Sequence, residues 1–179
     1  MSNIVDQIIL SYSRNKSLYI GEKVTMSEHM IQTAMLAEET NCSTNLVCSS
    51  LLHDYGHFIL ENPDDLVFKS KDGKHEEVGY EYLKKYFIKD VLKPIKYHVK
   101  AKRYLARKNK YFKFLSKASK LSLKLQGGIM NDEEAKKFEN NKFFEDSIKL
   151  REFDEMAKKT DTKIKPISKY KNLLTSKLL

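Results

Sequence analysis

The sequence predicts a single all-α domain spanning residues 1–179. Prolines and glycines are scarce, at three and six residues, whereas lysine, glutamate, leucine and alanine, which favour helices, occur throughout. Hydrophobic residues make up 41% of the chain, which suits one globular domain with a sizeable core. Apolar residues also recur at helical spacing in several segments. We therefore expect a helical bundle with a core at about 19–160 and a basic tail at 160–179.

The first segments are expected to form two helices and a covering loop. A short amphipathic helix should occupy residues 4–10. The polar, glycine-containing loop that follows carries Tyr19 and Glu22 just ahead of the next helix, where it is well placed to cover a site. Tyrosine packing on the core beside a solvated glutamate is the purely structural alternative. Residues 25–28 form a capping-box pattern, which predicts a helix from there to Glu39.

The remaining helices are predicted from apolar stripes and from their start and stop signals. A polar loop is expected after Pro63, at residues 69–74, and Pro94 should lie in the first turn of its helix, where proline is tolerated. The glycines at 127–128 should end the helical region before them. The expected helices run from Thr44 or Asn45 to about Ile59, from His75 to Tyr86, through Pro94 to Leu105, once or twice between Tyr111 and Leu125, from Asn131, and from Phe143 to about Lys159. The tail from Thr160 is expected to be irregular, with apolar residues that pack back on the domain.

Charge and cysteine content restrict the partners and the compartment. The formal net charge is +9, but the lysines are spread over the whole chain and lack an aromatic-and-arginine pattern, so we expect no nucleic-acid partner. The same field would draw a small anionic substrate. Cys42 and Cys48 match neither a redox pair nor a zinc motif, and they suggest reduced thiols. Because no signal peptide or membrane span is recognisable, we expect a cytoplasmic protein.

The histidines and two aspartates predict a dinuclear metal site. His53 and Asp54 stand together at the end of an apolar helical run, and His57 follows one turn later on the face of His53. Four imidazoles and two carboxylates form the candidate ligand set: His29, His53, Asp54, His75, His98 and Asp154. Six nitrogen and oxygen ligands exceed the needs of one catalytic ion and suit iron, manganese, zinc or nickel. Two ions bridged by a carboxylate, most simply Asp54, would account for the surplus.

Two basic residues lie close to these ligands in sequence. Lys102 stands one helical turn after His98, where a buried ammonium would bind an anion; a lysine that extends to solvent is the alternative. Arg151 precedes Asp154 by three residues and shares its helix face.

Several stretches of the sequence together form a recognisable pattern. They are Tyr19, His29, the segment 51–57 (LLHDYGH), the segment 75–79 (HEEVG), the segment 98–105 (HVKAKRYL), the segment 125–128 (LQGG) and the segment 151–154 (REFD). With them the chain resembles the HD-domain superfamily, and most closely its mixed-valent diiron oxygenase branch, which comprises the organophosphonate-cleaving oxygenases of the PhnZ type and, more distantly, myo-inositol oxygenase. This resemblance implies an HD-type helical bundle around two iron ions in the Fe(II)/Fe(III) state, with O2 as co-substrate.

The resemblance also implies a role for each candidate residue. His29, His53, Asp54 and Asp154 would bind one iron, and Asp54, His75 and His98 the other. Asp54, His57 and Lys102 would be catalytic, His57 being a substrate contact where hydrolytic HD proteins usually carry lysine. Lys102 and Arg151 would hold the phosphonate oxygens. Tyr19 and Glu22 would guard the iron site, and Ser122 and Gln126 would contact the other end of the substrate.

The implied activity is oxidative cleavage of a carbon–phosphorus bond. A 1-hydroxyalkylphosphonate, such as 2-amino-1-hydroxyethylphosphonate, would react with O2 to give a carboxylate, such as glycine, and phosphate. The enzyme would then act after a hydroxylase that makes the 1-hydroxyphosphonate. The alternatives are a metal-dependent HD phosphohydrolase acting on a phosphate ester or nucleotide, and a degenerate HD domain that serves as a binding module.

Overall fold

The computed structural model describes residues 3–19, 21–60 and 73–179, and it confirms the all-α prediction. Its regular elements are α1 (Ile4–Arg14), α2 (Met26–Glu39), α3 (Thr44–Leu52), α4 (Gly56–Ile59), α6 (His75–Leu83), α7 (Lys89–Leu105), α8 (Asn109–Phe114), α9 (Lys117–Leu125), α10 (Asp132–Glu139), α11 (Phe144–Met156), the 3-10 helix η1 (Ile167–Tyr170) and α12 (Lys171–Thr175). None of these helices is long and apolar enough to cross a membrane. The predicted limits of the core and the tail stay a prediction.

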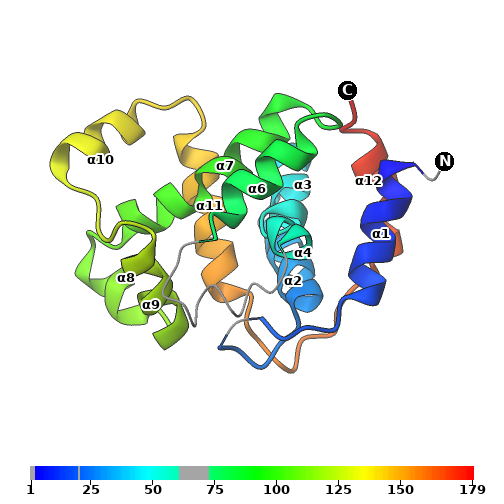
Figure 1. Ribbon diagram of the computed structural model, residues 1–179, viewed down its shortest axis with the longest axis horizontal. Helices are drawn as coiled ribbons and strands as arrows, with labels where there is room; N and C mark the ends of the chain where they lie inside the picture. Colours follow the sequence, from blue (N-terminus) through cyan, green and yellow to red (C-terminus); the bar gives the residue numbers. More distant parts are fainter. Residues whose placement is uncertain (1–2, 20, 61–72) are drawn as a thin grey trace.

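The helices form a central group with additions on two sides. Figure 1 shows α2, α3, α4, α6, α7 and α11 at the centre, with α8, α9 and α10 on one side and α1 with α12 on the other. Helix α11 packs on α7, α2 and α3, and α7 also packs on α3 and α6. The main hydrophobic core lies among the central helices and between them and α1, and it includes Tyr170 and Leu174 of the tail. The walls of the candidate site therefore come from helices distant in sequence.

Two helix starts follow the local signals closely. Thr25 Oγ1 accepts from the backbone N–H of Glu28 at 3.2 Å, and Glu28 accepts in return from the Thr25 backbone at 2.8 Å. Asn131 and Glu134 form the same reciprocal pair at the start of α10. These capping boxes satisfy backbone donors that have no partner within the helix, so they fix where each helix begins.

The helix expected from Thr44 to Ile59 is interrupted, which corrects the prediction at the most important segment. Helix α3 ends at Leu52 and α4 begins at Gly56. Between them the backbone makes tight bonds to the third residue back, from Tyr55 to Leu52 and from His57 to Asp54. Gly56 also lies against the start of α6, where an added Cβ would come within 1.9 Å of the His75 carbonyl oxygen. The break therefore lets α6 approach Asp54 closely.

Other element boundaries also differ from the predictions. Helix α1 continues to Arg14 rather than Leu10, and Pro94 lies inside α7 rather than in its first turn. The region between residues 111 and 125 forms two helices, α8 and α9, of which α8 already begins at Asn109. Pro63 lies outside the described residues, and so do residues 69–72 of the polar loop expected at 69–74.

The end of α11 and the tail depart from the predictions for reasons that lie in tertiary contacts. Helix α11 ends at Met156 instead of near Lys159, because the backbone of Lys159 exchanges two hydrogen bonds with the side chain of Gln32, at 2.8 and 3.1 Å. The tail is not irregular throughout, since it forms η1 and α12. Tyr170 and Leu174 are buried in the main core, which confirms that the tail packs back on the domain.

Substitution of Gly56 tests the close approach of α4 to α6. We expect Gly56→Ala to lower the free energy of unfolding by about 3 kcal/mol, because the new methyl group meets backbone that cannot move aside. Gly128→Ala is the control: nothing lies within 4 Å of its added Cβ, and only the left-handed backbone conformation, at about 1 kcal/mol, is penalised. Urea unfolding measures both variants, and equal losses would contradict the proposed contact.

Candidate metal centre

The first group of candidate ligands joins α2, the end of α3 and α11. The Nε2 atoms of His29 and His53 lie 3.2 Å apart, and His29 Nε2 lies 3.4 Å from Asp154 Oδ1. All three side chains are buried, and their ligand atoms lie within 4.8 Å of one another. This arrangement could hold one metal ion.

The second group consists of Asp54, His75 and His98, from the α3–α4 break, α6 and α7. The Nε2 atoms of His75 and His98 lie 3.0 Å apart. The ligand atoms of this group also lie within 4.8 Å of one another, so it could hold a second ion.

Asp54 lies between the two groups and faces each with a different oxygen. Its Oδ2 is 3.4 Å from His53 Nε2 and 3.7 Å from His29 Nε2. Its Oδ1 is 3.2 Å from His75 Nε2 and 3.5 Å from His98 Nε2. A carboxylate in this position can bridge two cations with one oxygen toward each.

Backbone carbonyls orient three of the four imidazole rings. The Nδ1 atoms of His29, His53 and His98 lie 2.9, 2.8 and 2.7 Å from the carbonyl oxygens of Ala157, Ser50 and Ile95. A carbonyl oxygen only accepts, so each Nδ1 carries a proton, and each Nε2, once it has lost its own proton, presents a lone pair to the centre. Such contacts are typical of metal-binding histidines. The carbonyl of Ala157 is available because α11 ends just before it.

The two carboxylates of the centre are ionised, and one oxygen of each has no hydrogen-bond partner among the described residues. Burial alone would raise the pKa of Asp54, but His53 and His75 hold it well below its usual value. Arg151 likewise overcomes burial and lowers the pKa of Asp154. Among the described residues, neither Asp54 Oδ1 nor Asp154 Oδ1 has a hydrogen-bond partner. Because buried anionic oxygens without partners are costly, and because the donor set is imidazole and carboxylate, the residues fit bound metal cations.

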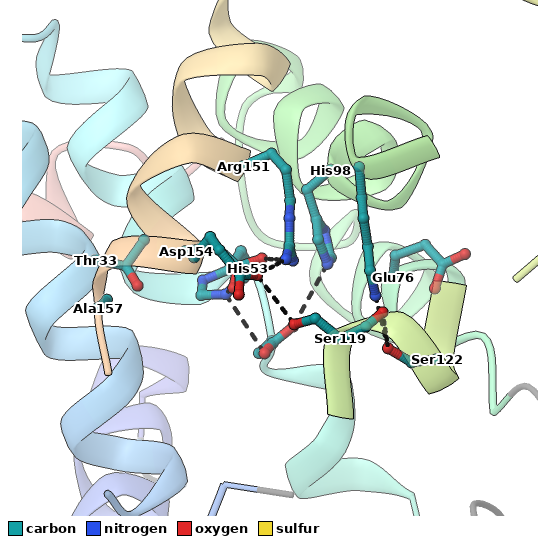
Figure 2. A network of polar contacts seen from close by, with 12 residues as sticks. Thr33, His53, Glu76, His98, Ser119, Ser122, Arg151, Asp154 and Ala157 are labelled. Carbon is teal, nitrogen blue, oxygen red and sulfur yellow. Dashed lines mark hydrogen bonds and ion pairs between the residues drawn. The ribbon is translucent and has the colours of Figure 1, made fainter. Parts of the chain in front are cut away.

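A cavity of about 400 Å³ opens next to this centre. It is lined by all of the substrate-contact and gating residues expected from the sequence, together with four of the candidate ligands: Tyr19, Glu22, Asp54, His57, His75, His98, Lys102, Ser122, Gln126, Arg151 and Asp154. Figure 2 shows Arg151 and Asp154 of α11 reaching the space beside His53 and His98, with Ser119 and Ser122 of α9 facing them. A small molecule in the cavity would therefore touch the metal centre directly.

His57 lies beside the second group but on α4, beyond the break. Its ring stacks on that of His75, with centroids 4.2 Å apart, and its buried Nδ1 has no hydrogen-bond partner among the described residues. Burial and then the neighbouring His75 lower the pKa of His57 to about 3, so the ring is neutral. It is outside both groups that could hold a metal.

Lys102 is buried, and so the alternative in which it extends to solvent is wrong. Its side chain is 4% exposed, and Nζ donates to Ser122 Oγ at 2.7 Å and to Gln126 Oε1 at 2.9 Å. Burial and then the charge of Arg151 lower the pKa of Lys102 to about 7. Ser122 and Gln126 therefore lie at the lysine end of the cavity.

Arg151 is held by three partners. Its Nε donates to Tyr111 Oη at 2.9 Å, Nη1 donates to Asp154 Oδ2, and Nη2 donates to Glu155 Oε2. The guanidinium thus links the metal centre to the cavity wall. Tyr111 and Glu155 were not predicted; the spacing of Arg151 and Glu155, four residues apart on one helix, is the only signal that the sequence offered.

The loop with Tyr19 and Glu22 covers the first group of ligands. The Tyr19 ring stacks on His29 with centroids 3.9 Å apart and planes within 9°. Glu22 Oε1 lies 3.3 Å from Lys158 Nζ, and an added Cβ on Gly21 would be 2.7 Å from the side chain of Ala118 on α9. Tyr19, Gly21 and Glu22 therefore form one wall of the cavity, next to α9 and the segment that follows α11.

The fold and the site together define a helical protein in which buried histidines and aspartates could hold two metal ions, beside a cavity lined by the buried side chains of Lys102 and Arg151. The family model described as the HD domain matches residues 26–134, which is more than half of the chain. The chain therefore belongs to the HD domain family. This result confirms the resemblance inferred from the sequence.

Curated relatives cover most of the chain. It is 44% identical over 149 residues, 83% of its length and 76% of the relative's, to the [1-hydroxy-2-(trimethylamino)ethyl]phosphonate dioxygenase (glycine-betaine-forming) of Leisingera caerulea. It is 40% identical over 163 residues, 90% of its length and 81% of the relative's, to the hydroxymethylphosphonate dioxygenase of Gimesia maris. An uncharacterized protein of Acanthamoeba polyphaga mimivirus is 41% identical over 174 residues, 95% of this chain and 80% of that protein.

Metal content tests the division into two groups. His98→Ala should reduce bound metal from two ions per chain to one, because it removes one of the three ligands of the second group. Asp54→Asn should lower the occupancy of both sites, since each group faces one oxygen of that carboxylate. His57→Ala is the matched control and should retain both ions. Elemental analysis after reconstitution measures all three variants, and a full complement of metal in His98→Ala would contradict the assignment.

Proposed function

We propose that this protein is an oxygenase that cleaves the carbon–phosphorus bond of a 1-hydroxyalkylphosphonate with O2. The products are a carboxylate and phosphate; 2-amino-1-hydroxyethylphosphonate, for example, would give glycine. The reaction balances, because both atoms of O2 and all substrate atoms appear in the carboxylic acid and phosphoric acid. The observation that carries the proposal is that two buried cationic side chains, Lys102 and Arg151, line the same cavity as the candidate dinuclear centre.

The relatives support this reaction class over others. Two of them, matched over most of the chain, are named as dioxygenases of 1-hydroxylated phosphonates, and they differ in the substituent that the names specify. What they share is the hydroxyl group on the carbon next to phosphorus. We therefore assign the hydroxyphosphonate head group as the part of the substrate that this site reads.

The proposed cofactor is a pair of iron ions in the Fe(II)/Fe(III) state. His29, His53, Asp54 and Asp154 would hold one ion, and Asp54, His75 and His98 the other. When bound, the ions supply coordination of the substrate's oxygens and the redox chemistry with O2. The choice of iron over manganese rests on the resemblance to the mixed-valent diiron oxygenase branch and not on the ligand types.

Lys102 and Arg151 would hold the phosphonate oxygens. A guanidinium has five N–H donors, and three are used by Tyr111, Asp154 and Glu155, so two remain for the substrate. A charged ammonium has three N–H donors, and Ser122 and Gln126 take two. Charge-assisted bonds from both groups suit a dianionic head group.

The other lining residues have supporting roles in this proposal. His57, neutral and with an unpaired Nδ1, would hydrogen-bond to the bound substrate. Ser122 and Gln126 would orient Lys102 as well as contact the substrate. Tyr19 and Glu22 would exclude water from the metal centre until the substrate enters, since the Tyr19 ring already covers His29. The enzyme would act in the cytoplasm after a hydroxylase that installs the 1-hydroxyl group, with no nucleic-acid partner.

Phosphate release with and without oxygen tests the proposed function. Iron-loaded protein should release phosphate from 2-amino-1-hydroxyethylphosphonate, hydroxymethylphosphonate or the trimethylammonio analogue only when O2 is present, with one carboxylate formed per phosphate. The panel identifies the preferred substituent. Equal release in the absence of O2, or release from phosphate esters alone, would instead support a phosphohydrolase and would overturn the proposal.

The pKa of Lys102 predicts a dependence of substrate binding on pH. Since that pKa is about 7, the ammonium loses its proton as the pH rises above this value, and the KM for the phosphonate should increase. Lys102→Arg should have a flatter profile, because a guanidinium keeps its charge. Both proteins see the same titration of the substrate, so their difference isolates the lysine. Parallel profiles would contradict the role of Lys102.

A further inference from the structure

Glu155 is a buried carboxylate whose two oxygens accept hydrogen bonds from four donors. Its side chain comes from α11, and the residue is 6% exposed. Oε2 accepts from Arg151 Nη2 and from Ser119 Oγ, the latter at 3.0 Å. Oε1 accepts from Lys158 Nζ at 2.8 Å and from the backbone N–H of Ser116 at 3.2 Å. Glu155 is outside the two groups of candidate metal ligands.

These contacts fix two walls of the cavity relative to each other. Ser116 is the N-cap of α9, so the carboxylate binds at the start of that helix, where its charge is favourable. Helix α9 carries Ser122, and Gln126 follows at its end; both hold Lys102. On the other wall, Glu155 accepts from Nη2 of Arg151, while Asp154 accepts from Nη1. One carboxylate thus connects the supports of both cations that line the cavity.

We propose that Glu155 is a positioning residue for phosphonate binding. It fixes the guanidinium of Arg151 so that its two remaining N–H donors face the substrate, and it anchors the α9 wall that supports Lys102. The inference rests on the proposed function, because it assumes a phosphonate in this cavity. It assigns no contact between Glu155 and the substrate or the metal ions.

A different role for Glu155, as a countercharge only, predicts different binding results, and the two roles can therefore be told apart by experiment. If Glu155 only neutralised the nearby cations, loss of its charge would make the cavity more positive, and an anion would bind more tightly. If it positions Arg151, loss of its geometry weakens binding whether or not the charge is kept. Glu155→Gln removes the charge, whereas Glu155→Asp keeps the charge but shortens the side chain by one methylene.

Calorimetric titration with methylphosphonate, which lacks the 1-hydroxyl group and cannot react, measures binding without turnover. We expect both variants to bind it about tenfold more weakly than the parent protein, a loss of about 1.4 kcal/mol. Their KM for the hydroxyphosphonate should rise by a larger factor than their kcat falls. Metal content should match that of Glu152→Gln, the control, which makes the same charge change at an exposed position of α11.

The outcomes separate this inference from the proposed function. Tighter binding by Glu155→Gln together with unchanged binding by Glu155→Asp overturns the positioning role, as does unchanged binding in both. If Glu155→Gln fails to fold, Glu155→Asp alone decides, because a countercharge role predicts that it binds like the parent. A parent protein that neither binds methylphosphonate nor releases phosphate overturns the proposed function itself, and this inference with it.

Discussion

The carboxylate of Asp54 is the feature on which the rest of the site depends. It is buried between two groups of imidazoles, with one oxygen toward each. An anion in this position costs several kcal/mol unless cations compensate it. Backbone carbonyls direct the rings of His29, His53 and His98 so that each Nε2, once deprotonated, can present a lone pair to a metal ion at the centre. The candidate ligands therefore come from five segments distant in sequence: the four helices α2, α6, α7 and α11 and the break after α3.

Arg151 transmits the geometry of the centre to the cavity wall. Through Nη1 it neutralises Asp154, and through Nη2 it reaches Glu155, which connects in turn to α9 and Lys158. Lys158 pairs with Glu22 of the covering loop. The candidate ligand Asp154, the guanidinium of Arg151 and the covering loop therefore belong to one continuous set of charge-assisted contacts. Such a set keeps buried charges paired while it leaves donors free for an incoming anion.

The sequence predicted those parts of the structure that depend on local chemistry. Capping boxes at Thr25 and Asn131 placed two helix starts, and the inward stripes carrying His29, His75 and His98 brought those residues together as expected. The break after Leu52 was missed, because the tight turn and the approach of Gly56 to His75 depend on a helix distant in sequence. The end of α11 was missed for the same reason, since Gln32 of α2 binds the Lys159 backbone. Glu155 carried no motif, and its contacts with Ser116 and Ser119 appear only once α9 is in place.

The central claim is that one carboxylate joins two metal ions into a single centre. Electron paramagnetic resonance of the iron-loaded protein, oxidised by one electron, tests this claim most directly. A bridged Fe(II)/Fe(III) pair predicts one signal from two exchange-coupled ions, and it should account for most of the iron bound. A spectrum dominated by an isolated ferric ion, with no coupled signal at full metal occupancy, would show two independent sites and contradict the account.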